Sequence, residues 1–123
     1  MVEFDVGGTG YCVPVDAARA VRTAVGMVSL PDPGPHVAGL LSGDPPLTVV
    51  APFGLDGQRI IVLEAEDVVY GLLVHTVTGL LHIDETAVRA APRGQQREIV
   101  SGSITVAGHL LLVADPTAMA VGL

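Results

Sequence analysis

The apolar residues of this chain come in short runs that alternate with polar residues and end at turns. In the clearest example, Arg59 to Leu63 is followed by the polar stretch Glu64 to Asp67, and Val68 to Val74 then returns as a mostly apolar run. Alternation with period two is typical of a half-buried strand, and a short continuous apolar run is typical of a strand buried on both faces. The pattern predicts a β-hairpin over residues 59 to 74, with Glu64 to Asp67 as its turn.

Two further segments show the same arrangement. Residues 2 to 15 alternate on both sides of Gly7 to Gly10, which predicts a hairpin with a four-residue glycine loop, and residues 104 to 113 predict a hairpin that turns at Ala107-Gly108. The apolar phase of the expected strands predicts buried side chains at Phe4, Val15, Leu40, Leu63, Leu73, Val74 and Leu112.

Helices are expected only as short turns. Asp16 can cap an alanine-rich turn over Ala17 to Val21, and Asp115 can cap a last turn over Thr117 to Val121 that has Pro116 at its first position. The predicted fold class is therefore all-β with short helical turns.

Prolines shape the segment between the first two hairpins. Proline cannot donate to a β-ladder, so Pro31 to Pro35 is expected to be an extended crossover. It leads into short strands at 37 to 41 and 47 to 51. Three hairpin-like units in so short a chain favour small closed barrels, because closure removes exposed strand edges.

The charge balance excludes some classes of partner. The chain has 13 acidic residues against 6 basic ones, all of them arginine, for a formal net charge of −7. Nucleic acids and anionic membrane surfaces attract basic faces, so neither is expected to be a partner. No segment is apolar for long enough to span a bilayer, and the single cysteine, Cys12, is expected to be a buried thiol. We expect a cytoplasmic protein without membrane insertion.

No residue pattern predicts catalysis, a cofactor or a bound metal. The four histidines and Cys12 form no metal-binding motif, and the Gly7 to Gly10 segment lacks the lysine of a phosphate loop. Ser101-Gly102-Ser103 has no adjacent base that would activate a nucleophile. The protein is therefore not expected to be an enzyme, and no catalytic, cofactor-binding or metal-binding residue is predicted.

Several segments, taken in order along the chain, resemble the CheW-like domains of bacterial chemotaxis. They are Phe4-Asp5-Val6-Gly7-Gly8, Tyr11-Cys12-Val13-Pro14-Val15-Asp16, Leu30-Pro31-Asp32-Pro33, Pro35-His36-Val37-Ala38-Gly39-Leu40 and Tyr70-Gly71-Leu72-Leu73-Val74-His75-Thr76-Val77-Thr78-Gly79. The resemblance implies one domain over residues 1 to 123, built as two intertwined five-stranded SH3-like barrels with a groove between them. It also implies a non-catalytic adaptor that links a chemoreceptor tip to the regulatory domain of a CheA-type histidine kinase.

The chain departs from the family pattern at the turn after Gly39. CheW-like domains usually carry an arginine there that is important for kinase activation, and Asp44 falls on that arginine while Pro52 falls on a following aspartate. His75 similarly replaces an aspartate. Because the charge at position 44 is reversed, the chain is expected to be a diverged member whose signalling partner is the usual kinase or an analogous protein.

The resemblance and the apolar pattern together predict a partner-binding groove. It is expected to be lined by Val15, Ala18, Val21 and Val37, with Asp44 and His75 at its margin. An alternative remains open, namely a small β-barrel that binds a small molecule or performs a weak hydrolysis with His75 and Asp115 as its polar pair. The sequence sets no oligomeric state.

Overall fold

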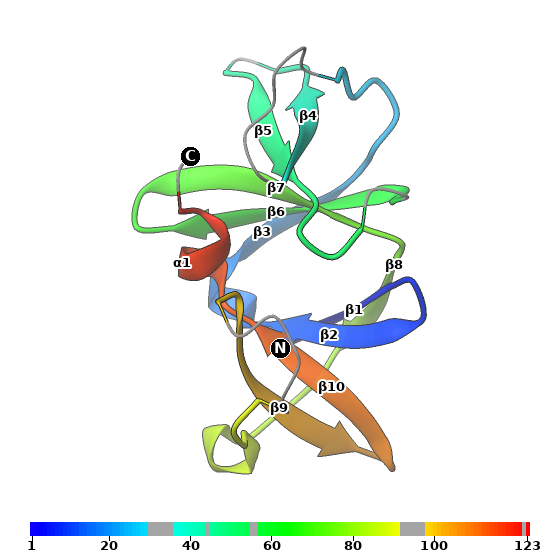
Figure 1. Cartoon of the computed structure of the whole chain (residues 1–123), viewed down its shortest axis with the longest axis vertical. Coiled ribbons are helices and arrows are strands. Elements are labelled where there is room, and N and C mark those ends of the chain that lie inside the picture. The colour runs from blue at the N-terminus through cyan, green and yellow to red at the C-terminus, as the bar shows by residue number, and fades with distance from the viewer. Residues whose placement is uncertain (30–35, 44, 55–56, 92–97, 122) are drawn as a thin grey trace.

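Strands make up most of the computed structural model, which describes residues 1–29, 36–43, 45–54, 57–91, 98–121 and 123 (Figure 1). The strands are β1 Val2–Val6, β2 Thr9–Val13, β3 Ala18–Thr23, β4 Val37–Leu41, β5 Leu47–Val50, β6 Arg59–Ala65, β7 Val68–Val74, β8 Thr76–Leu80, β9 Val100–Val106 and β10 His109–Ala114. Three short helical elements accompany them: η1 Val15–Ala17, η2 Glu85–Ala87 and α1 Pro116–Met119. The predicted all-β class is confirmed.

The strands form two five-stranded sheets, and each sheet takes its strands from different parts of the chain. The first sheet has the order β8-β1-β2-β10-β9 and the second has the order β3-β6-β7-β5-β4. The first therefore contains both ends of the chain and the second contains its middle, so the expectation of two intertwined five-stranded units is confirmed. Each sheet also contains one parallel pair, β2 with β10 and β5 with β7.

Each sheet closes towards a barrel through the same kind of backbone bridge. The chain just after β3 forms a bridge to β4 through Val28 and Leu40, and the chain after β8 forms a bridge to β9 through Arg89 and Ser103. In both places a glycine lies against the bridging backbone, where a Cβ would clash with the carbonyl oxygen of Val28 or of Arg89. The two barrels thus correspond strand for strand, with β8 in the place of β3 and β9 in the place of β4.

The predicted helix over Ala17 to Val21 is wrong. The chain makes only the single turn η1, which Asp16 does not cap with its side chain, and then enters strand β3. β3 pairs antiparallel with β6, from Ala18 opposite Leu63 to Thr23 opposite Arg59. This pairing satisfies the backbone of an alanine-rich segment from a distant part of the sequence, and it overrides the local helix propensity.

All three predicted hairpins are present, but two of their turns are shorter than predicted. β1 and β2 are joined by Gly7 and Gly8 alone, and β6 and β7 by Glu66 and Asp67 alone. These turn residues have positive φ, as two-residue hairpin turns require. The turn at Ala107-Gly108 is confirmed, and its strand β9 begins earlier than expected, at Val100.

Other segments also differ from expectation. Strand β8 was not predicted, although its first three residues, Thr76, Val77 and Thr78, are β-branched. The predicted strands at 37 to 41 and 47 to 51 are present as β4 and β5. The expected crossover at Pro31 to Pro35 lies outside the described residues.

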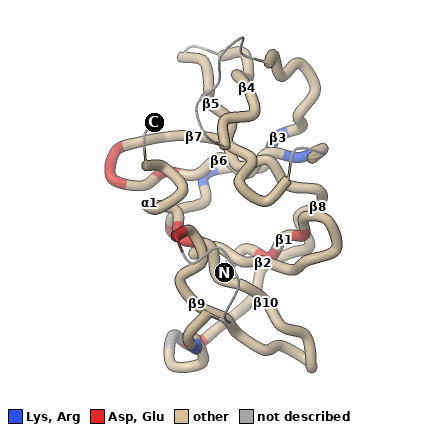
Figure 2. Tube along the Cα trace, viewed as in Figure 1, with Lys and Arg blue, Asp and Glu red and all other residues tan. Residues whose placement is uncertain are grey.

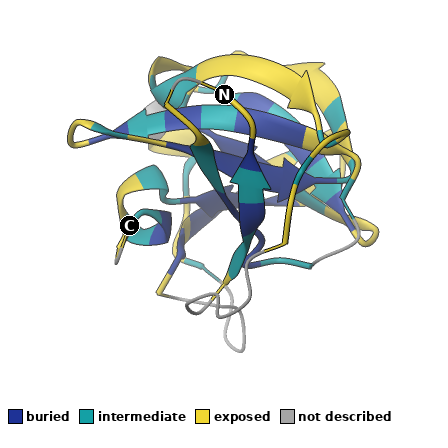
Figure 3. Ribbon diagram, turned by 90° about the horizontal axis from the view of Figure 1, so that it is seen from above, coloured by how far each residue is buried: buried dark blue, intermediate teal, exposed yellow. Residues whose placement is uncertain are grey.

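The largest hydrophobic core lies between the two sheets. It takes side chains from β1, β2, β9 and β10 on one side and from β5, β6 and β7 on the other, with Met119 of α1. Each sheet also has a smaller core of its own, made by Leu41, Val49, Ala51, Ile60 and Leu73 in the second sheet and by Cys12, Ile104, Leu111 and Val113 in the first. The central strands therefore have both faces buried, as Figure 3 shows by the buried ribbons inside the molecule.

The core predictions are confirmed at five positions and wrong at two. Phe4, Leu63, Leu73, Val74 and Leu112 are buried. Val15 is instead 49% exposed, because η1 replaces the end of the predicted strand. Leu40 is only half-buried and Leu41 is buried in its place, since β4 has a bulge between Val37 and Gly39 that shifts the phase of the strand.

The C-terminal helical turn α1 begins as predicted. Asp115 is the N-cap, and its Oδ1 accepts hydrogen bonds from the backbone N–H groups of Thr117 at 3.0 Å and Ala118 at 3.4 Å. The buried Tyr70 hydroxyl donates to the carbonyl oxygen of Pro116 at 2.6 Å. This bond ties the last turn of the chain to β7 in the other sheet.

The burial pattern predicts opposite results for two neighbouring leucines of β10. Leu112 lies in the core between the sheets, so Leu112→Ala should lower the free energy of unfolding by about 2–5 kcal/mol. Leu110 is 52% exposed, so Leu110→Ala should change it by less than about 1 kcal/mol. Urea denaturation of the two variants measures both values, and equal losses would show that the faces of β10 are assigned wrongly.

Candidate docking surface

Strand β3 presents an exposed face at the end of the second sheet. Ala18 is half-buried and packs against the core between the sheets, whereas every residue from Arg19 to Thr23 is exposed. Val21 in the middle of this strand is 50% exposed. An edge strand with an exposed branched apolar side chain is the kind of surface that binds another protein.

A hollow lies where the chain enters β3. Val15 lines it together with Met1, Leu80, Leu81, His82 and Ile83, and its volume is about 220 Å³. Leu80 at the end of β8 is 69% exposed. The hollow is fixed at its base by paired backbone hydrogen bonds between Met1 and Leu81, of 2.9 and 2.8 Å. We call these six residues the Val15 hollow.

The Val15 hollow lies between the turn that precedes β3 and the end of β8. Val15 comes just before β3, the end strand of one sheet, and Leu80 closes β8, the end strand of the other. Only Val15 of this group was expected at a binding surface. The β-branched residues Thr76, Val77 and Thr78 were the signal in the sequence that could have indicated strand β8.

The other predicted site residues lie apart from this surface. Val37 is on β4, at the other end of the sheet order from β3, and packs against the core between the sheets. His75 joins β7 to β8, its Nδ1 accepts a hydrogen bond from the Gly7 N–H at 3.1 Å, and its own N–H donates to Asp5 O at 3.0 Å. Asp44 lies outside the described residues. The structure thus places Val15, Ala18 and Val21 on one continuous segment, and Val37 and His75 elsewhere.

Arginines gather beside the exposed face of β3, although the chain as a whole is acidic. Arg19 and Arg22 are on β3, and Arg59 is opposite Thr23 on the neighbouring strand β6 (Figure 2). Arg19 forms an ion pair with Glu64 across the two strands. Both partners are partly exposed to solvent, so this pair adds little to stability. Arg22 follows Val21, so its side chain points to the opposite face of β3, whereas Arg59, opposite Thr23, leaves a positive charge on the same face as Val21.

The described residues offer no assembled reactive group. His75 and Asp115, the polar pair of the alternative function, are each engaged in local hydrogen bonds, to the β1–β2 turn and to the start of α1. Within the described ranges, no three His, Cys, Asp or Glu residues are grouped so that they could hold a metal ion. In the same part of the chain, no helix is long and apolar enough to cross a bilayer.

Cys12 is buried, as predicted, and its environment suppresses the thiolate. The pKa of the thiol is raised from its ordinary value of 9.0 to about 11, chiefly by burial, while the N-terminal ammonium group lowers it and the Glu3 carboxylate raises it by smaller amounts. Burial raises the pKa of Tyr70 as well, with a contribution from Asp115. Both groups are therefore neutral near pH 7, and Cys12 is not a nucleophile.

The raised pKa of Cys12 leads to a test with a thiol reagent. A pKa of about 11 instead of 9.0 leaves about a hundredfold less thiolate at pH 8, so the folded protein should react with Ellman's reagent at least that much more slowly than the protein in urea. The unfolded chain loses this proton first, near pH 9, so the free energy of unfolding should fall as the pH rises from about 9 to about 11. Equal reaction rates in the folded and unfolded states would contradict the buried assignment.

Comparison with known proteins assigns this architecture to a family. The family model for the CheW-like domain matches residues 1–121. The crystal structure of the scaffolding protein TtCheW from Thermoanaerobacter tengcongensis is similar over 98% of this chain and 92% of that chain, with a TM-score of 0.83 and 18% sequence identity. At this identity the likeness to TtCheW shows the fold. A search of curated proteins found no match.

Proposed function

Since this chain belongs to the CheW-like domain family, a family of non-catalytic coupling adaptors in bacterial chemotaxis, we propose that it acts in the cytoplasm as a single-domain adaptor. Its proposed partners are a chemoreceptor tip and the regulatory domain of a CheA-type histidine kinase or an analogous signalling protein. On this proposal the chain binds both partners through its surface and catalyses no reaction itself.

The exposed face of β3 is the observation that best supports a docking role. Exposure of an apolar side chain such as that of Val21 to water is unfavourable, and binding a partner there would remove this apolar surface from solvent. Val15 adds a second exposed apolar contact within the Val15 hollow, and Arg59 supplies a positive charge on the same face as Val21. A partner that fits this surface presents an apolar ridge with acidic groups at its edge.

The remaining predicted site residues have different places in this proposal. Ala18 supports β3 from within, because it packs on the core between the sheets. Val37 and His75 lie on other elements, and we propose that they act at the margin of a larger interface. Asp44 replaces the arginine that CheW-like domains usually carry, so we propose that the second partner presents a basic group there.

Two valines with equal exposure provide a matched test of the docking surface. Val21 on β3 and Val69 on β7 are each 50% exposed, and both are strand residues of the second sheet. Val21→Glu should weaken binding of a chemoreceptor tip fragment from the same genome by about 2 kcal/mol or more, because it puts a charge into the interface. Val69→Glu should leave the affinity nearly unchanged, as measured by isothermal titration calorimetry.

The thermal midpoints of the two variants serve as the folding control. Both substitutions are at exposed positions, so both midpoints should stay close to that of the parent protein. If Val21→Glu binds the receptor fragment as tightly as the parent does, the docking surface is not on β3. If the parent protein binds neither the receptor fragment nor the kinase domain, the proposed function is wrong.

A further inference from the structure

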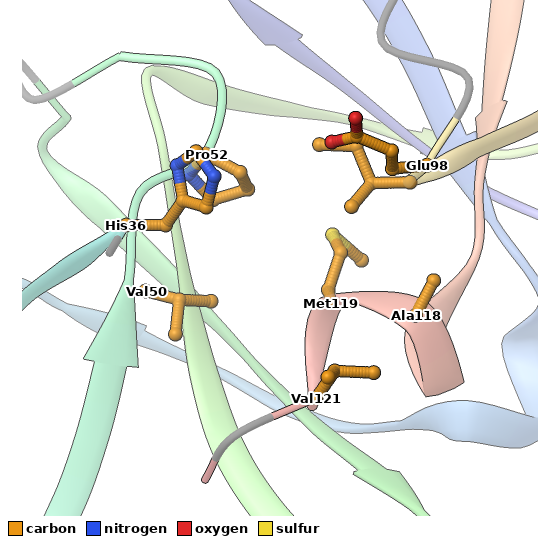
Figure 4. Close-up of a pocket in the computed structure, with 8 residues that line it drawn as sticks. His36, Val50, Pro52, Glu98, Ala118, Met119 and Val121 are labelled. Atoms are coloured by element: carbon orange, nitrogen blue, oxygen red, sulfur yellow. The ribbon is translucent and has the colours of Figure 1, made fainter. Parts of the chain in front are cut away.

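A second and larger hollow lies at the C-terminal helical turn. Its volume is about 370 Å³, and it is lined on one side by Val50 and Pro52 and on the other by Ala118 and Met119 (Figure 4). Ile99 also belongs to its lining. Val50 belongs to the second sheet, whereas Ile99 directly precedes β9 of the first sheet. We call it the helix hollow. It is an apolar space with walls from both barrels, and its size is that of a small-molecule site.

Two ionisable side chains complete the lining of the helix hollow from opposite sides. His36 lies beside Pro52, and Glu98 lies beside Ile99 (Figure 4). Glu98 is exposed and has no ion pair or hydrogen-bond partner among the residues that the structure describes. A carboxylate at the edge of an apolar space favours a ligand with an apolar body and a positive charge.

The backbone at His36 is held in an uncommon conformation at this same place. Its φ is 65°, in the left-handed region that residues with a Cβ rarely adopt, and its carbonyl oxygen accepts a hydrogen bond from the Ala51 N–H at 2.6 Å. This hydrogen bond holds the backbone of His36 in place where its side chain lines the hollow beside Pro52.

We propose that the helix hollow is a binding site for a small organic cation, an amine or guanidine carried on an apolar body. The apolar body would lie on Val50, Ile99 and Met119, and the cationic group would form a charge-assisted hydrogen bond with the Glu98 carboxylate. The net charge of −7 attracts a cation to this protein and disfavours an anion. Such a ligand contacts both barrels at once, and the site is distinct from the docking surface on β3.

Tryptamine is a suitable probe, with the neutral alcohol tryptophol as its matched control. Titration of the isotope-labelled full chain with tryptamine, followed by NMR, should give saturable shifts at the amides of Ile99, Ala118 and Met119. Tryptophol should bind about tenfold more weakly, because it lacks the charge-assisted hydrogen bond. Glu98→Gln should weaken tryptamine binding by a similar factor and leave tryptophol binding unchanged.

Two further variants distinguish specific binding in the helix hollow from general electrostatic attraction of the cation to the acidic protein. Ala118→Phe should abolish binding of both probes by filling the hollow, whereas Glu66→Gln, which removes an exposed carboxylate from the β6–β7 turn, should leave both affinities unchanged. The proposal is overturned if tryptamine does not saturate the shifts, if Glu98→Gln and Glu66→Gln behave alike, or if only lysine-containing peptides bind. Receptor binding by Glu98→Gln is measured in parallel and should equal that of the parent, so failure at this site is distinguishable from failure of the adaptor function.

Discussion

The structure depends on the hydrophobic core that is shared between the two barrels. All four aromatic residues of the chain meet there: Phe4, Tyr11 and Tyr70 are part of it, and Phe53 stacks on Tyr11 with ring centroids 4.1 Å apart. Because the central strands alternate between this core and the core of their own sheet, neither barrel can separate without exposing one face of every central strand. The shared core therefore holds the surface elements of both barrels in fixed positions.

The shared core fixes the positions of the docking surface on β3, with the adjoining Val15 hollow, and of the helix hollow. The strands β3 and β8 lie at the ends of their sheets, so their side chains contribute little to the hydrophobic cores. They leave apolar side chains exposed at the surface. The Val15 hollow forms between the turn that precedes β3 and the end of β8, and the helix hollow forms where α1 crosses from one barrel towards the other. Both hollows take residues from segments that are far apart in the sequence. A diverged adaptor can thus change its partners at these surfaces while keeping the core.

Elements that depend on local sequence patterns could be predicted, whereas elements that depend on pairing between distant strands could not. The hairpins around Glu66-Asp67 and Ala107-Gly108 could be predicted because alternation and turn residues are local signals. Strand β3 could not, because its alanines favour a helix until β6 lies beside them. The prediction that Leu40 is buried was wrong because the sequence does not reveal the bulge in β4. Of the predicted site, Val15, Ala18 and Val21 do share one segment, whereas Val37 and His75 were grouped with them only by analogy with the family.

The central claim is that this chain couples two proteins, so the most direct measurement asks whether both bind at the same time. Analytical ultracentrifugation of the chain mixed with a chemoreceptor tip fragment and a kinase regulatory domain from the same genome answers this. The account predicts a ternary complex in which each partner is retained when the other is added, because an adaptor needs separate surfaces for the two. Displacement of one partner by the other, or sedimentation of the chain alone in the presence of both, would contradict it.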